Sequence, residues 1–89
     1  MKARLRGKYW NLVRAKNLAD RGDIDDPNAK GKKIRISTRI EDDSEELLEV
    51  LIHECLHGLL WDLSEDSVTE SAHDLAKLLY DLGARIHLE

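Results

Sequence analysis

Two histidines and a glutamate in the middle of the chain have the types and spacing for metal chemistry. His53, Glu54 and His57 form the pattern HExxH inside the run LLEVLIHECLHGLLWDL. If this run is helical, residues four apart lie one above the other, so that both imidazoles can bind one zinc ion with Glu54 at the edge of the same face. Zinc lowers the pKa of a water molecule, and a nearby carboxylate can take that water's proton as it attacks a carbonyl group. The pattern therefore predicts the chemistry of a metallopeptidase.

The residues around the motif have the periodicity of a helix. We predict a helix over residues 43–61, capped at its start by Asp43 or Ser44. Its apolar residues fall on one broad arc and are Leu47, Leu48, Leu51, Ile52, Cys55, Leu56 and Leu59. This arc can pack on a sheet while the two histidines face a cleft. The alternative is a pair of partly exposed helix histidines that bind no metal.

A catalytic zinc ion needs a third protein ligand, and the residues after the motif predict the element that supplies it. A second helix is expected over residues 64–83, with an apolar stripe formed by Val68, Ala72, Leu75, Leu79 and Leu82. The short connection makes the two helices antiparallel neighbours. This pairing places Glu70, His73 and Asp74 opposite the two histidines. The residues alone leave the third ligand open among these three.

The first 40 residues predict a small sheet that supports the helices. Residues 8–14 have the aromatic and β-branched content of a strand, and residues 32–38 alternate between charged and apolar side chains. Ile34 and Ile36 would face the helices, and Lys33 and Arg35 the solvent. Residues 20–31 are dense in Asp, Gly, Asn and Pro and predict a loop. The strand at 32–38 would either form a plain hairpin with the first strand or be an edge strand that an extended substrate can join.

These elements predict an α+β fold in which a small β-hairpin or sheet packs on two antiparallel helices. With 89 residues the chain forms one domain, 1–89. Residues 1–40 contain 12 Lys or Arg and 4 Asp or Glu, whereas residues 41–89 contain 2 and 14. A basic sheet and acidic helices can attract each other, or the basic half can contact an acidic peptide or nucleic acid. Only Tyr9 and Trp10 accompany the basic residues as aromatic side chains, which gives a nucleic-acid surface little support.

The distribution of apolar and cysteine residues bears on location. No apolar run approaches the roughly 18 residues of a membrane span, and no apolar segment follows the basic N-terminus as in a secretory signal. Cys55 is the single cysteine, so the chain forms no internal disulfide, and its place on the apolar arc predicts a buried free thiol. We therefore expect a cytoplasmic protein without a membrane partner.

The motif and the residues that follow it resemble a known class of enzyme. HExxH followed by Glu-x-x-x-Asp on a second helix is similar to the gluzincin peptidases, and this resemblance implies that Glu70 binds zinc while Asp74 supports His53. The chain more closely resembles small HExxH proteins of phages and bacteria. The shared layout covers Arg4 to Gly83 and reads RLRG…W…(R)GD-x-D-x-P…GK-x-I-x-I…L-IHE-x-LH…WDL-x-E-x-x-V…A-x-D-L-A…L-x-x-LG. In that layout the acid at Asp74 is the more typical one, which implies that Asp74 is itself the ligand.

The sequence thus predicts a minimal zincin that hydrolyses peptide bonds in a peptide or protein substrate. His53, His57 and either Glu70 or Asp74 would bind Zn²⁺, Glu54 would activate the water, and His73 would support the site from beside the ligands. Arg35 or His73 would be the donors to a developing oxyanion. The rival interpretation is a non-catalytic zinc-binding module that acts through a protein partner. A third is a nucleic-acid-associated regulator that uses the basic half.

Overall fold

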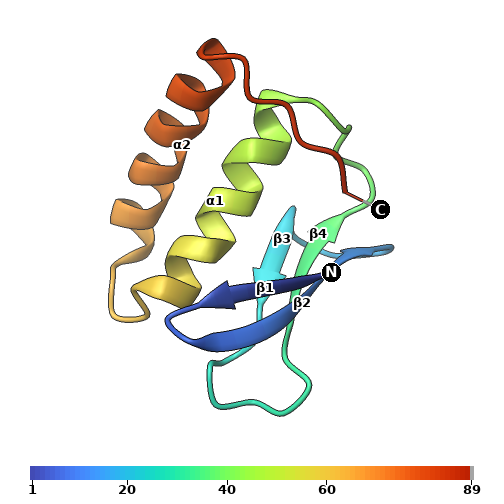
Figure 1. Cartoon of the computed structure of the whole chain (residues 1–89), viewed down its shortest axis with the longest axis vertical. Coiled ribbons are helices and arrows are strands. Elements are labelled where there is room, and N and C mark those ends of the chain that lie inside the picture. Colours follow the sequence, from blue (N-terminus) through green and yellow to red (C-terminus); the bar gives the residue numbers. More distant parts are fainter. Residues whose placement is uncertain (89) are drawn as a thin grey trace.

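The computed structural model describes residues 1–88 and combines a four-stranded mixed sheet with two helices (Figure 1). The strands are β1 (Lys2–Leu5), β2 (Lys8–Ala15), β3 (Gly22–Ile24) and β4 (Lys33–Ser37), and the helices are α1 (Glu45–Leu59) and α2 (Glu65–Asp81). The predicted α+β class is therefore confirmed. Within residues 1–88, neither helix combines the length and apolar character that crossing a bilayer requires.

The sheet has the strand order β1-β2-β4-β3. Strands β1 and β2 form an antiparallel hairpin around Arg6 and Gly7, which both have positive φ angles as a tight two-residue turn requires. Strand β4 pairs in parallel with β2 and antiparallel with β3. Two predictions for residues 32–38 were therefore wrong, because β4 forms neither a hairpin with β2 nor the edge of the sheet. The edge strand on this side is β3, which lies inside the predicted loop 20–31.

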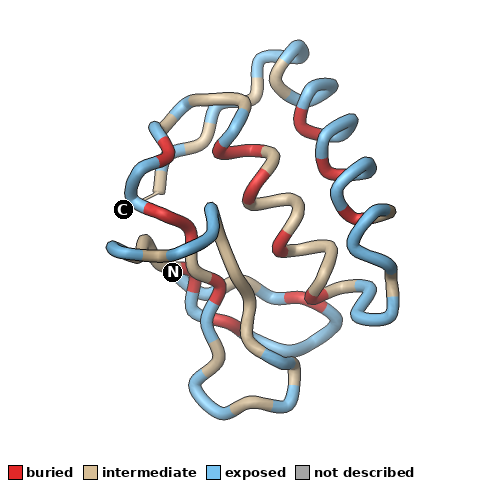
Figure 2. Tube along the Cα trace, turned by 180° about the vertical axis from the view of Figure 1, so that it is seen from behind, coloured by how far each residue is buried: buried red, intermediate tan, exposed pale blue. Residues whose placement is uncertain are grey.

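The core lies between the sheet and α1, and α2 packs on the other side of α1 (Figures 1 and 2). Ile34 and Ile36 are fully buried in this core, as their alternation predicted. Arg35 lies on the opposite face of the sheet, where it binds Asp23 at 3.0 Å and Asp25 at 2.8 Å. Because α1 rather than α2 contacts the strands among the described residues, the molecule has three layers: sheet, α1 and α2.

The ends of both helices follow from local hydrogen bonding. Ser44 caps α1, because its hydroxyl accepts a hydrogen bond from the backbone N–H of Leu47 at 3.0 Å. Ser64 caps α2 through the N–H of Ser67 at 3.2 Å. Gly83 follows α2 with a φ of 101°, a conformation that glycine adopts at low cost. Each helix lies within its predicted range.

The buried face of α2 differs from the predicted stripe. Its buried residues are Val68, Ala72 and Ala76, whose spacing of four places them in one line along the helix. Two of the three are alanines, which allow α2 to approach α1 closely. The exposed leucines of α2 are Leu75, Leu78 and Leu79, and its C-cap residue Leu82 is exposed as well.

Candidate active site

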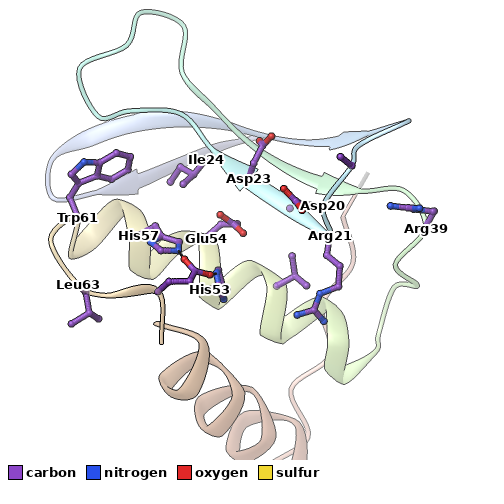
Figure 3. Close-up of a pocket in the computed structure, with 14 residues that line it drawn as sticks. Asp20, Arg21, Asp23, Ile24, Arg39, His53, Glu54, His57, Trp61 and Leu63 are labelled. Atoms are coloured by element: carbon purple, nitrogen blue, oxygen red, sulfur yellow. Dashed lines mark ion pairs between the residues drawn. The ribbon is translucent and has the colours of Figure 1, made fainter. Parts of the chain in front are cut away.

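The two motif histidines meet a carboxylate from the start of α2 (Figure 3). His53 and His57 lie one turn apart on α1, with their ring centroids 4.9 Å apart and an edge-to-face orientation. The Nε2 atom of His53 is 3.0 Å from one carboxylate oxygen of Glu65, and the Nε2 atom of His57 is 2.8 Å from the other. The three ligand atoms of this cluster all lie within 4.8 Å of one another.

The donor set of this cluster fits a zinc ion. Two imidazole nitrogens and one carboxylate oxygen are the three protein ligands of a common class of catalytic zinc site, which leaves a fourth position for water or substrate. In a tetrahedral site with zinc–ligand distances near 2.1 Å, neighbouring ligand atoms are about 3.4 Å apart. The two nitrogen-to-oxygen distances at Glu65 are slightly shorter than this value. The two histidines contact different oxygens of the same carboxylate, so all three groups already lie near the spacing that one ion requires.

The structure brings Glu65 to the histidines and leaves Glu70 and Asp74 outside the cluster. The direction of α2 explains this difference. Val68 faces α1, and at 100° per residue Glu70 lies about 200° around the helix from it and Asp74 about 120°. Both acids therefore face solvent, whereas Glu65 in the first turn reaches back across the connection.

A sequence signal for Glu65 exists. Glu65 directly follows the helix cap Ser64 and is the acid in the WDL-x-E part of the layout. However, acids are common in the first turn of a helix because they complement the helix dipole. This position alone therefore does not distinguish Glu65 as a ligand. The prediction of Glu70, His73 and Asp74 assumed that the two helices form a symmetric hairpin about their short connection. It therefore favoured Glu70 and Asp74, which lie roughly one and a half and two and a half turns farther along α2 than Glu65.

His73 lies away from the ligand cluster. Its Nδ1 atom is 2.9 Å from a carboxylate oxygen of Glu49 on α1, and this hydrogen bond raises the pKa of His73 above its usual value. Glu49 in turn lies 3.5 Å from Arg21, which also binds Glu46 at 3.3 Å. His73 thus belongs to an ion-pair network that connects α2, α1 and the residue before β3.

Glu54 is the most deeply buried acid of the site. Its residue is only 7% exposed, and burial raises the pKa of its carboxyl group to about 7. Burial is the largest cause of this raised pKa; the carboxylates of Asp23, Glu65 and Asp20 also contribute to it, and Arg21 opposes it. A carboxyl group with a pKa near neutrality can exchange protons readily at neutral pH.

Two further residues named from the sequence, Cys55 and Arg35, lie outside the ligand cluster. Cys55 is half-buried on α1 and packs against the core, and burial raises the pKa of its thiol to about 11. Arg35 is held by Asp23 and Asp25 on the outer face of the sheet and does not line the cleft. The arginines that do line the cleft are Arg21 and Arg39.

The cleft beside the cluster lies between α1 and the edge strand β3 and has a volume of about 940 Å³. Gly22 allows the strand to approach the helix, because a Cβ atom there would lie 2.8 Å from Val50 Cγ1 and 3.3 Å from Glu54 Cγ. No side chain fits into this space without displacing a neighbour. The glycine therefore sets how near the strand lies to Glu54.

Among residues 1–88, the backbone of β3 has hydrogen-bonding groups without a strand partner along its outer edge. Arg21 accepts a hydrogen bond from Ser37 at 2.8 Å, and Asp25 donates one to Lys33 at 3.0 Å. Because bonded and non-bonded pairs alternate in an antiparallel ladder, the N–H and C=O groups of Gly22 and Ile24 point away from β4. They face the open side of the sheet, next to Glu54 and the histidines.

The site thus combines three potential metal ligands, a buried carboxyl group and a free strand edge in one cleft. Such an arrangement can hold a cation, activate a water molecule and align an extended chain. Comparison with known proteins adds no relative, since no family model, curated protein or solved structure matches this chain.

Proposed function

We propose that this protein is a zinc-dependent peptidase that hydrolyses peptide bonds in extended segments of a peptide or protein substrate. The single observation that carries the proposal is the placement of Glu54 between a three-ligand cluster and the free edge of β3. His53, His57 and Glu65 would hold the zinc ion. When bound, zinc supplies Lewis acidity and makes a water molecule acidic enough to lose a proton near neutral pH.

Glu54 is the proton carrier of the proposed reaction. Its carboxylate takes a proton from the water that attacks the scissile carbonyl carbon, and it then gives this proton to the leaving amine. Its burial and the nearby carboxylates of Asp23, Glu65 and Asp20 support this role, because a carboxyl group in that environment both accepts and releases a proton at neutral pH.

The edge of β3 positions the substrate. An extended peptide that pairs with Gly22 and Ile24 adds a fifth strand to the sheet and passes beside Glu54. Pairing uses only backbone groups of the substrate, and it requires that the substrate segment be unfolded. Unfolded or flexible regions of proteins are therefore the expected targets.

A second function is supported by the position of Glu65. Because the histidines lie on α1 and Glu65 on α2, an ion held by all three would tie the two helices together and stabilise a small domain without any reaction. Glu54 distinguishes the two functions, because such a structural site does not need it. Under both functions we expect the protein in a reducing compartment such as the cytoplasm, since its single cysteine has no partner within the chain.

Zinc content measured by elemental analysis tests the site. We expect about one zinc ion per chain in the wild type, and loss of this ion in His57→Ala and Glu65→Ala. The matched controls Glu70→Ala and Asp74→Ala should retain it, because both acids face solvent on α2. Retention of zinc by Glu65→Ala together with loss in Asp74→Ala would refute the ligand set.

Hydrolysis of unfolded protein tests the reaction. The zinc-loaded wild type should release new peptide termini, detected by mass spectrometry, and Glu54→Gln should lose this activity while retaining zinc. A Glu54→Gln variant with wild-type function in the cell, and no detectable hydrolysis by either protein, would favour the structural zinc site.

A further inference from the structure

We infer that the end of the cleft beyond His57 is an apolar binding site, which selects substrate segments with an aromatic or large aliphatic side chain next to the scissile bond. This inference rests on the proposed function and names the substrate class for the same cleft. It assigns the deciding role in specificity to Trp61.

Trp61 follows His57 by four residues, and it lies just after the end of α1. The helix has ended by then, because Leu60 has the non-helical backbone angles φ −129° and ψ 67°, so the connection between α1 and α2 positions Trp61. Figure 3 shows the indole at the same end of the cleft as His57. The Trp61 residue is 44% exposed, so a large part of this aromatic surface is free to contact a ligand.

The segment that carries Trp61 is held in place at two points. The N–H of Leu63 donates a hydrogen bond to the carbonyl oxygen of Leu60 at 2.9 Å, which closes the turn after α1. Arg6 donates a hydrogen bond to the carbonyl oxygen of Leu59 at 3.3 Å, which connects the end of α1 to the β1–β2 turn. The backbone on both sides of Trp61 is therefore restrained before any ligand binds.

Two other apolar side chains complete this end of the cleft. Ile24 of β3 and Leu63 of the connection line it together with Trp61 (Figure 3). A Cβ atom at Gly58 would lie 2.9 Å from Ile24 Cδ1, so that Ile24 lies directly on the surface of α1. Arg21 and Arg39 lie toward the opposite end of the cleft (Figure 3).

The position of Ile24 connects this apolar end to the substrate backbone. Ile24 offers free N–H and C=O groups on the open edge of β3, so a peptide that pairs there runs past Trp61. Side chains of an extended peptide alternate in direction, and one side chain beside the scissile bond then points toward the indole. Burial of an aromatic or branched aliphatic side chain against Trp61 would add affinity that a serine or glycine cannot supply.

Peptide binding to the inactive zinc-loaded Glu54→Gln protein tests the inference without requiring hydrolysis. The probes are two dye-labelled peptides, Ala-Gln-Phe-Ala-Phe-Gln-Ala and the same sequence with Ser in place of both Phe. Fluorescence anisotropy should show that the Phe peptide binds at least about tenfold more tightly than the Ser peptide. Adding Trp61→Ala should reduce this ratio to less than about threefold.

Leu60 provides the matched control. It is the neighbour of Trp61 and 49% exposed, yet it does not line the cleft. Leu60→Ala should therefore leave the tenfold preference unchanged. Equal affinity for the two peptides, no measurable binding of either, or an equal loss of preference in Leu60→Ala and Trp61→Ala would each overturn the apolar site.

The two proposals fail in different ways. If the Phe peptide binds in a Trp61-dependent manner but the zinc-loaded wild type hydrolyses nothing, the apolar site is supported and the peptidase function is refuted. If the wild type hydrolyses unfolded protein at sites without enrichment of apolar residues, and Trp61→Ala leaves the pattern of sites unchanged, only the apolar site is refuted.

Discussion

Replacing Glu54 by Gln should stabilise the metal-free protein at neutral and alkaline pH. In the folded state the pKa of Glu54 is raised from 4.5 to about 7, chiefly by burial. The folded protein therefore holds a proton that the unfolded chain has lost, and stability decreases as the pH rises from 4.5 through 7. One pKa unit corresponds to about 1.4 kcal/mol, so the ionised carboxylate costs the folded state up to about 3 kcal/mol above pH 7.

Gln has nearly the same shape and carries no charge, so the variant avoids this cost. Urea unfolding in the presence of EDTA should show similar free energies of unfolding for the two proteins near pH 4.5. At pH 8, Glu54→Gln should be more stable by about 1–3 kcal/mol. The control Glu70→Gln changes an exposed acid and should stay within about 0.5 kcal/mol of the wild type at both pH values.

The dependence on pH is the decisive part of this experiment. A difference between Glu54→Gln and the wild type that is the same at both pH values would refute the proposed cost of ionisation. So would a variant that is less stable than the wild type at pH 8. Loss of hydrolysis combined with a gain in metal-free stability would mean that this acid serves the reaction at the expense of the fold.

Three further predictions concern the surroundings of the site. Gly22→Ala should lower the free energy of unfolding by about 1–3 kcal/mol in urea titrations, because the new Cβ atom would lie 2.8 Å from Val50 Cγ1; an unchanged value would mean that β3 can shift freely. At pH 8, Cys55 should react with iodoacetamide at least about 100-fold more slowly in the folded protein than in urea, because burial raises the pKa of its thiol to about 11. Mass spectrometry follows this reaction, and equal rates would show an accessible thiolate. NMR titration should show a pKa of His73 above its usual value, because His73 is hydrogen-bonded to Glu49. The Glu49→Gln variant should bring this pKa back toward the usual value and leave the zinc content unchanged. A lower zinc content in Glu49→Gln would connect this pair to the proposed metal site.

The motif helix and the class of fold were predictable, because both depend on local periodicity. His53, Glu54 and His57 are brought together by helix geometry alone, and alternation was enough to identify the buried side of Ile34 and Ile36. The position of β4 within the sheet was not predictable in this way. Arg35 suggested a solvent-exposed face, but its charge is matched by Asp23 and Asp25, two acids of the segment that was predicted to be a loop.

The contact of Glu65 with the histidines and the edge position of β3 depend on features that a sequence pattern expresses weakly. Strand β3 has only three residues, and Gly22 and Asp23 are both uncommon in strands. Its pairing is decided by contacts with β4 and by the close approach to Val50, not by local preference. Glu65 was missed for a related reason, since the direction in which α2 leaves its cap decides which acid faces α1.

The open edge of β3 also has a consequence for the behaviour of the protein at high concentration. Unpaired backbone groups at a sheet edge can pair with another copy of the same chain as readily as with a substrate, which promotes aggregation. Here the edge strand is only three residues long and is preceded by two charged residues, Asp20 and Arg21. Short length and adjacent charge are the usual means by which proteins protect such edges. The same few residues thus limit self-association at the edge where we propose that an extended peptide binds.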